Sequence, residues 1–245
     1  RNAADVGSDA VSCMGLTVAD RPTIASVPTD QTIGELLASA TEPTFSFEFF
    51  PPKNEVGQEL LTKTISELEP LGPDWVSVTY GANGSSRQRT LDATMAILQT
   101  TDFRVMGHLT CTGQSIDELK AVIDAYGDSG VHNILAIRGD MPGGPSVPWE
   151  LHPGGLANAT ELVELVRSRG DFCVGVAAFP DGHATSTLEQ DAQILLGKQQ
   201  AGASFAVTQL FFDLGHYFEL VGRARSAGCT LPIVPGIMPV TSVKQ

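Results

Sequence analysis

The sequence contains, at residues 45–53, the stretch Phe45-Ser46-Phe47-Glu48-Phe49-Phe50-Pro51-Pro52-Lys53. Aromatic side chains favour a packed, pleated surface, and two consecutive prolines cannot continue the hydrogen-bond ladder of a sheet. The stretch therefore predicts a short buried strand that ends at the prolines. Its one carboxyl group, on Glu48, would lose hydration among apolar neighbours, which raises the pKa and suits an acid working near neutral pH. A buried Glu48 paired with a Lys or Arg elsewhere explains this stretch equally well.

A unit of strand, loop and helix recurs from this stretch onward. Apolar segments predict strands at 44–50, 75–80, 103–110, 132–138, 172–178, 205–211 and 232–237. Amphipathic segments between them predict helices at 55–70, 88–99, 115–127, 158–169, 187–201 and 215–227. Capping-box spacing at Ser115–Glu118 and Asn158–Glu161, with Gly170 and Gly228 after two of the helices, supports these boundaries. The alternation is typical of parallel strands covered by helices.

Two architectures fit this alternation, an open doubly wound sheet and a closed (β/α)8 barrel. The open fold usually carries a Gly-rich turn after its first strand, but here Pro51-Pro52-Lys53 follows and prolines offer no N–H donors. The barrel predicts polar residues at the carboxyl ends of many strands, which this sequence has. We therefore expect a TIM-type (β/α)8 domain at 44–245, preceded by an N-terminal tail and a short helix (33–40) within 1–43.

Only seven of the eight barrel strands are found in the sequence. We expect the natural chain to continue roughly 40–60 residues beyond Gln245, since one strand–helix unit takes about 30 residues, and to supply strand eight there. Without it, the sheet should be open between strands seven and one.

Composition narrows the class of protein. The net charge is −13, from 28 acidic and 15 basic residues, so the surface repels nucleic acid and anionic membranes. No apolar run approaches the ~18–20 residues that span a bilayer, and no secretory signal pattern is present. The four cysteines lack metal-ligand spacing, which fits a reducing compartment and no bound metal. We expect a cytoplasmic protein.

Polar residues stand at the ends of the predicted strands. Alone, His108 would more often be a core histidine, and Arg138 with Asp140 a surface pair. Gln209 alone could serve a backbone group of the barrel lining. Six polar strand ends that point at one barrel mouth together indicate an active site, with Glu48 and Asp140 as its carboxylates. Because neither a metal site nor a nucleophile stands out, the chemistry points to a bound organic cofactor, which these residues alone do not identify.

At these residues the sequence resembles the methylenetetrahydrofolate reductase family. The chain shares with that family, in the same order and at similar spacing, the stretches FSFEFFPPK, VSVTYGANGSSRQRT, HLTC, ILAIRGDMP, GVAAFPDGH, AGASFAVTQLFFD and PGIMPV. The resemblance covers roughly residues 44–245. It implies a (β/α)8 barrel that holds FAD at the carboxyl ends of its strands. The implied reaction of one-carbon metabolism is the reduction of 5,10-methylenetetrahydrofolate to 5-methyltetrahydrofolate by NADH or NADPH.

The resemblance also implies roles for single residues. Glu48 would be the general acid, Asp140 a carboxylate beside flavin and folate, and Gln209 the residue that binds the pterin and positions the nicotinamide. FAD-binding positions would be Thr79, His108, Ile137, Arg138, Gly139, Asp140, Ala177, Phe179, His183, Asp191, Lys198 and Val207. Among these, Arg138, His183 and Lys198 would supply positive charge to the diphosphate. Two positions depart from the family: Phe179 replaces a frequent Tyr, and Val243 replaces a Phe that some relatives carry.

Two alternative functions remain open at this level. One is a Schiff-base barrel aldolase that uses Lys198, although this residue falls on a predicted helix. The other is a folate- or flavin-binding module without catalysis. The sequence does not decide between NADH and NADPH, and it leaves the oligomeric state, a homo-oligomer included, undetermined.

Overall fold

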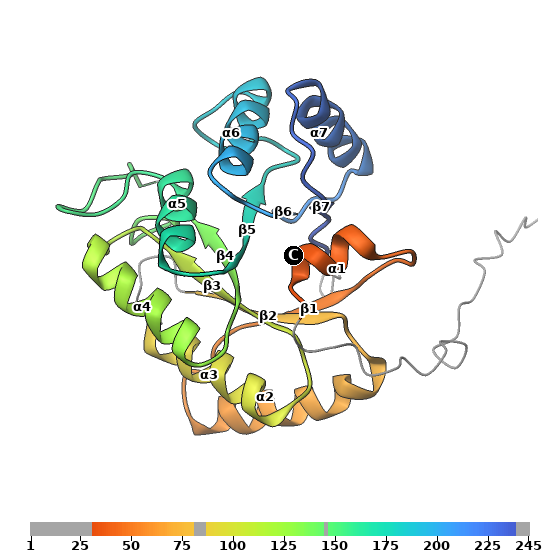
Figure 1. The fold of residues 1–245 in the computed structure, drawn as a ribbon, viewed down its shortest axis with the longest axis vertical. Coiled ribbons are helices and arrows are strands. Elements are labelled where there is room, and N and C mark those ends of the chain that lie inside the picture. Colours follow the sequence, from red (N-terminus) through yellow and green to blue (C-terminus); the bar gives the residue numbers. More distant parts are fainter. Residues whose placement is uncertain (1–30, 81–86, 145–146, 239–245) are drawn as a thin grey trace, which may run out of the picture.

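The computed structural model describes residues 31–80, 87–144 and 147–238, in which seven parallel strands form one sheet. The strands pair in chain order: β1 (Ser46–Phe49), β2 (Trp75–Val78), β3 (Val105–Thr110), β4 (Asn133–Ile137), β5 (Cys173–Ala178), β6 (Phe205–Thr208) and β7 (Ile233–Val234). Figure 1 shows that the sheet is curved, with its strands arranged in an arc. In the described residues no pairing joins β7 to β1, so the curled sheet is an incomplete TIM-type barrel, as predicted.

Helices lie on both sides of this curled sheet. The outer helices are α2 (Glu55–Leu68), α3 (Arg87–Thr100), α4 (Ile116–Asp128), α5 (Ala159–Arg169), α6 (Leu188–Gln200) and α7 (Leu214–Ser226), and a 3₁₀ turn, η2 (Glu69–Leu71), follows α2. The short helix α1 (Ile33–Ser39) lies beside β1, on the concave side of the sheet (Figure 1). All the helices predicted from the amphipathic segments are present, with ends shifted by one or two residues.

The outer face of the sheet is apolar because alternate strand residues point at the helices. Phe49 of β1 and Val76 of β2 pack with Leu61 and Ile65 of α2. Further around the sheet, the strands β3 to β6 pack in the same way against α4, α5, α6 and α7. This continuous outer core fixes the curvature of the sheet and leaves the other strand residues on the inner face.

The amino ends of the strands are closed on the inner face by α1. Ile33 and Leu36 of this helix pack with a buried set contributed by five strands: Trp75, Met106, Leu135, Cys173 and Phe205. The Ile33 N–H donates to Asn133 Oδ1 at 2.9 Å, which ties the start of α1 to β4. Gly175 leaves room for this packing, since a Cβ there would lie 2.6 Å from the Phe205 ring.

All seven strands are shorter than the sequence predicts, and three of them lose three or four residues. The expected strand at 205–211 ends at Thr208, and the one at 232–237 is reduced to Ile233–Val234 between Pro232 and Pro235. The strand at 44–50 is reduced to Ser46–Phe49. Prolines cannot donate to a ladder, and Asp213 already caps α7 by accepting from the Gly215 N–H, so the intervening residues are loop.

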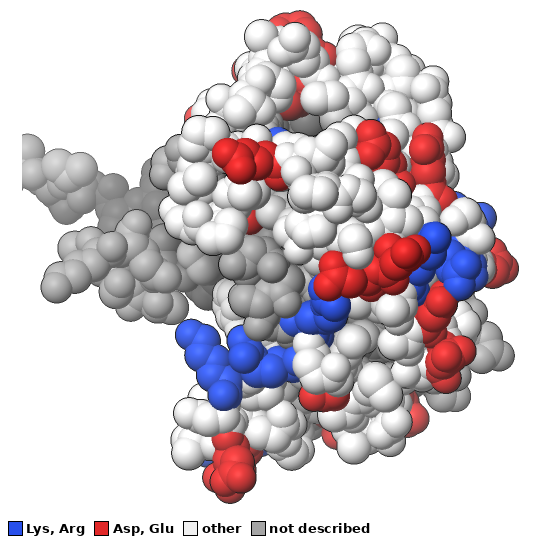
Figure 2. Space-filling view, turned by 90° about the vertical axis from the view of Figure 1, so that its left-hand side faces the viewer, with Lys and Arg blue, Asp and Glu red and all other residues white. Residues whose placement is uncertain are grey.

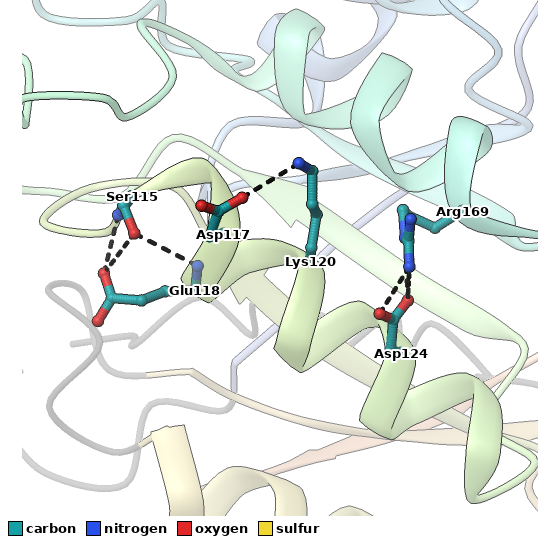
Figure 3. Close-up of polar contacts among 6 residues, drawn as sticks. All are labelled: Ser115, Asp117, Glu118, Lys120, Asp124 and Arg169. Atoms are coloured by element: carbon teal, nitrogen blue, oxygen red, sulfur yellow. Dashed lines mark hydrogen bonds and ion pairs between the residues drawn. The ribbon is translucent and has the colours of Figure 1, made fainter.

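One of the two predicted capping boxes is confirmed. Ser115 accepts from the Glu118 N–H, and the Glu118 carboxylate accepts from the Ser115 N–H (Figure 3). At the start of α5, Asn158 caps the helix, but the Glu161 carboxylate accepts instead from the Ala157 N–H. The predicted capping box at Asn158 was therefore wrong, because the expected hydrogen bond from the Asn158 N–H to the Glu161 carboxylate is not formed.

Charges on the surface are mixed. On the face drawn in Figure 2, basic side chains lie in small groups beside acidic ones, among a larger uncharged area. Asp124 of α4 and Arg169 of α5 form an ion pair on the surface, with an N–O distance of 2.7 Å (Figure 3). Within the described ranges, no helix has both the length and the apolar character that crossing a bilayer requires.

Candidate active site at the carboxyl ends of the strands

Glu48 lies on the inner face of the sheet, at the end opposite to α1. Phe47 and Phe49 point at the outer helices, so the residue between them must point inward. Glu48 stands opposite Ser77 in the register of β1 and β2, and its Oε2 lies 3.5 Å from Nε2 of His108 on β3. The predicted buried strand is only partly buried: Phe49 is buried, but the side chain of Glu48 is 52% exposed, and Phe50, which follows the strand, is 80% exposed.

The surroundings of Glu48 favour its protonated form. Partial removal from water raises the pKa of the Glu48 carboxyl, and a hydrogen bond from Ser77 opposes this shift. Burial lowers the pKa of His108 to about 4, so the imidazole is neutral at pH 7. The contact between the two residues is therefore not an ion pair at neutral pH, and His108 does not hold the carboxyl ionised.

Two buried polar atoms on the inner face of β3 lack a partner. His108 Nε2 and Thr110 Oγ1 form no hydrogen bond within the part of the chain that the structure describes. They are two residues apart on one strand, so both belong to the same face. Buried polar groups are nearly always hydrogen-bonded, and an unsatisfied pair next to Glu48 suits the polar edge of a ligand.

The loop after β4 brings Arg138, Gly139 and Asp140 to the same end of the sheet. Gly139 has a φ of +86°, a left-handed conformation that favours glycine. The Arg138 guanidinium lies 5.5 Å from the centre of the Trp149 ring. Trp149 Nε1 in turn donates to Thr112 Oγ1, and this hydroxyl donates to the Arg138 carbonyl. Trp149 thus lies against the end of β3, with its ring beside the Arg138 guanidinium.

The loop after β5 and the helix α6 contribute a cluster of charged groups. The His183 N–H donates to the buried Asp191 carboxylate at 2.8 Å, and the His183 ring lies 5.0 Å from that of Phe179. Lys198 Nζ donates to the Ala177 carbonyl at 2.8 Å. Burial lowers the pKa of Lys198 to about 8, so this amine is still mainly charged at pH 7.

These charged groups are close enough to act on one another. Burial lowers the pKa of His183, the charges of Arg138 and Lys198 lower it further, and those of Asp191 and Asp140 oppose the shift. The structure therefore brings together Arg138, His183 and Lys198 from three different segments. The prediction that His183 supplies positive charge was wrong, because its lowered pKa leaves the ring neutral at pH 7.

The remaining predicted positions lie at the same strand ends. Gln209 follows β6 with an exposed side chain, while its N–H donates to the Ala178 carbonyl. Four others are half-buried: Thr79, Ile137, Ala177 and Val207. No contact among the described residues joins Glu48 to Asp140 or Gln209. The predicted loop positions 81–86 and Val243 lie outside the described residues.

The sequence analysis missed four polar side chains of this site. Ser77 and Thr110 could have been found from strand alternation, because they share the inner face with Glu48 and His108. Thr112 and Trp149 carried no such signal, since their contact depends on how a long loop folds.

Comparison with known proteins identifies the family. A sequence model described as methylenetetrahydrofolate reductase matches residues 32–245. The chain belongs to the methylenetetrahydrofolate reductase family. It is 40% identical over 201 residues to the 5,10-methylenetetrahydrofolate reductase of Salmonella typhimurium, covering 82% of this chain and 66% of that protein. It is 36% identical over 215 residues to methylenetetrahydrofolate reductase (NADH) 1 of Arabidopsis thaliana, a match that covers 83% of this chain and 36% of the plant protein. The chain thus spans just under two thirds of the bacterial reductase and about a third of the plant one.

Solved structures of low sequence identity share the fold of this family member. An uncharacterized protein from Clostridium thermocellum, which binds two copies of 5-methyl-5,6,7,8-tetrahydrofolic acid, has a TM-score of 0.62 at 13% identity, covering 86% of this chain and 70% of that one. An oxaloacetate acetylhydrolase in complex with 3,3-difluorooxalacetate has a TM-score of 0.60 at 13% identity, covering 87% and 74%. At this identity the likeness concerns the fold alone.

Proposed function

We propose that this chain is a flavin-dependent catalytic domain that reduces 5,10-methylenetetrahydrofolate to 5-methyltetrahydrofolate with NADH or NADPH. Membership of the family supports this reaction. The observation on this chain that carries the proposal is the Glu48 carboxyl group. It lies on the inner face at the carboxyl end of the sheet, with a raised pKa, beside the neutral imidazole of His108, whose Nε2 has no hydrogen-bond partner among the described residues.

The residues present fit FAD. Its diphosphate needs local cations in a chain of net charge −13, and Arg138 and Lys198 would provide them, while His183, whose pKa is lowered, would contribute a neutral ring. The unsatisfied His108 Nε2 and Thr110 Oγ1 suit the polar edge of a flavin ring, and the half-buried Ile137 and Val207 suit its apolar faces. When bound, FAD would supply the redox chemistry by accepting a hydride from the nicotinamide and giving one to the folate.

Glu48 would supply the proton of the folate half-reaction. Opening of the five-membered ring of the substrate requires a proton on the departing nitrogen, and a raised pKa makes the protonated carboxyl group more populated than that of an ordinary glutamate at the same pH. The neutral state of His108 matters here, because a charged imidazole at 3.5 Å would lower the pKa of Glu48 and remove the acid.

Asp140 and Gln209 would act on the substrate from neighbouring strand ends. The carboxylate of Asp140 would favour the cationic iminium that ring opening produces, and it would bring negative charge next to the flavin. Gln209 has an exposed amide that can donate to and accept from a pterin ring. Both roles rest on the family and on the position of these residues.

One observation favours the Schiff-base alternative. The lowered pKa of Lys198 would make its amine a better nucleophile at neutral pH. Against it, Lys198 is buried on α6 and donates to the Ala177 carbonyl, so it does not present a free amine to the barrel mouth. Trapping of an aldehyde or ketone substrate on Lys198 by borohydride would support this alternative.

Purified protein tests the proposal directly. The full chain should take up FAD and show the absorption bands of oxidised flavin. Anaerobic NADH or NADPH should bleach these bands, and 5,10-methylenetetrahydrofolate should restore them. A chain that takes up no FAD contradicts the proposal. A chain that binds FAD and folate without either change in absorption would be a binding module instead.

A further inference from the structure

A hydrogen bond between a loop and a helix lies beside the charged cluster of the site. His216 Nδ1 and Asp181 Oδ1 are 2.5 Å apart, although the residues are 35 positions apart in the chain. Asp181 belongs to the β5–α6 loop (179–187), and His216 belongs to the first turn of α7. The bond therefore connects the segment that carries Phe179 and His183 to a separate helix.

The position of His216 is not explained by its own helix. A positive charge in the first turn of a helix is disfavoured by the helix dipole, and Asp213 already caps α7 through the Gly215 N–H. Acidic groups compensate for this: Asp181 from the neighbouring loop, Asp213 with Oδ2 at 3.9 Å from Nε2, and Glu219 one turn further along. Of these, only Asp181 belongs to another element.

The β5–α6 loop is held from both sides. On one side, the His183 N–H donates to Asp191 of α6. Within the loop, the Gly182 N–H donates to the Phe179 carbonyl, with Gly182 at a φ of +85°. On the other side, Asp181 is bonded to His216 of α7. Loss of the Asp181–His216 bond would leave the loop attached to α6 but no longer to α7.

We propose that His216 is a positioning residue, which through Asp181 holds the β5–α6 loop in the conformation that presents Phe179 and His183 to FAD. This role rests on the proposed function, in which FAD binds at these residues. His216 itself lies outside the residues proposed to touch FAD. The hold should weaken as the imidazole loses its proton, since a neutral ring no longer attracts the Asp181 carboxylate.

The direction of the pH dependence follows from the bond. The hydrogen bond with Asp181 raises the pKa of His216, burial opposes this shift as the next-largest influence, and the charges of Asp213, Asp181 and Glu219 raise it further. A group whose pKa is raised in the bonded state stabilises that state fully only below its ordinary pKa, which for histidine is about 6.5. The contribution is lost as the pH rises through the raised value. Lys198 titrates separately, with a pKa of about 8.

Hydrogen exchange of the full chain without FAD tests the hold on the loop. At pH 6, His216→Ala should speed amide exchange in residues 179–186 by about two- to fivefold, the size expected for an exposed charged pair. The matched control is Asp124→Asn, which breaks an exposed pair between α4 and α5 and should leave this loop unchanged. Equal exchange of the loop in wild type and His216→Ala overturns the proposal.

Flavin affinity tests the consequence, by quenching of FAD fluorescence between pH 6 and 7.5. The wild-type dissociation constant should rise by about two- to fivefold over this range. His216→Lys keeps a cation and should flatten the profile, and His216→Ala should bind more weakly at pH 6. Wild type and His216→Ala with the same affinity throughout contradict the positioning role and leave the proposed function standing. A wild-type chain that binds no FAD contradicts the proposed function, and the exchange rates alone then decide whether His216 holds the loop.

Discussion

The two ends of the inner face of the sheet differ sharply, although the same strands supply both. At the amino ends, Trp75, Met106 and Phe205 are at most 2% exposed and pack under α1. At the carboxyl ends, Glu48 is half exposed, and His108 with Thr110 holds buried polar atoms that lack partners in the described residues. The amino ends form a packed apolar core, whereas the carboxyl ends do not.

This difference shows how one alternating pattern serves two purposes. Every second strand residue points inward, so β2 to β6 each place one buried side chain under α1, and later inward residues such as His108 lie at the opposite end. Where α1 covers the inner face, apolar residues add stability. Where it does not, buried ionisable groups such as His108 and Lys198 are held with lowered pKa values, which costs stability. The predictions below test this division from both ends.

The largest expected effect on stability is at the amino ends. Phe205→Ala removes a fully buried ring that packs over Gly175, and this should lower the free energy of unfolding by about 3–5 kcal/mol. Urea denaturation of the full chain measures it, with Phe205→Leu as the milder control. Refolded or stabilised Phe205→Ala protein should keep the FAD affinity of the wild type. A loss below about 1 kcal/mol would show that this end is not a core.

Lys198 should show opposite pH trends in stability and in cofactor binding. Its pKa is about 8 in the folded chain against 10.5 ordinarily, so the unfolded state binds more protons between these values. Stability of the FAD-free chain should therefore rise with pH from about 8 to 10.5, by about 3 kcal/mol in total. FAD affinity should fall over the same window as the cation is lost.

Lys198→Met is the matched variant for this trend. It should abolish the Lys198 part of the stability slope and weaken FAD binding already at pH 7. Denaturation curves at several pH values give the free energy of unfolding of wild type and of Lys198→Met. The difference between the two proteins at each pH isolates the contribution of Lys198 from those of other groups that titrate. Identical slopes in the two proteins would contradict the assignment.

A smaller effect is expected at Trp149. Trp149→Ala removes the ring over Arg138 and the bond to Thr112, which should weaken FAD binding by about two- to fivefold through a less well fixed guanidinium. Trp149→Phe keeps the ring and should recover most of the affinity. Fluorescence titration with FAD measures both variants, and an unchanged affinity in Trp149→Ala would exclude this role of the ring.

The fold was predictable because its signals are local and repeated. Apolar strands and amphipathic helices alternate through the chain, and all seven strands were recognised. Strand ends were less predictable, since the sequence around Phe211 is apolar enough for a strand while the cap at Asp213 ends it early. The capping box predicted at Asn158 was also wrong, because the Glu161 carboxylate can reach the N–H of Ala157 and accepts from it instead of from the Asn158 N–H.

The site was predictable in its members and less so in their environment. Glu48 and His108 were recognised from strand-end position and family resemblance, but their contact depends on the register of three strands. The exposure of Glu48 could not be predicted, because it depends on what fills the inner face. The long-range contacts of Trp149 with Thr112 and of His216 with Asp181 each involve a loop, and loop conformation carries no periodic signal.

The most direct test of the account compares the two half-reactions of Glu48→Gln by anaerobic stopped-flow absorbance. Flavin reduction by NADH or NADPH needs no acid, so its rate should stay within about tenfold of wild type, a barrier change near ~1.4 kcal/mol. Reoxidation by 5,10-methylenetetrahydrofolate needs the proton and should slow by about 10²–10⁴-fold. If both half-reactions slow together, Glu48 supports the fold or flavin binding instead, and its assignment as the acid is wrong.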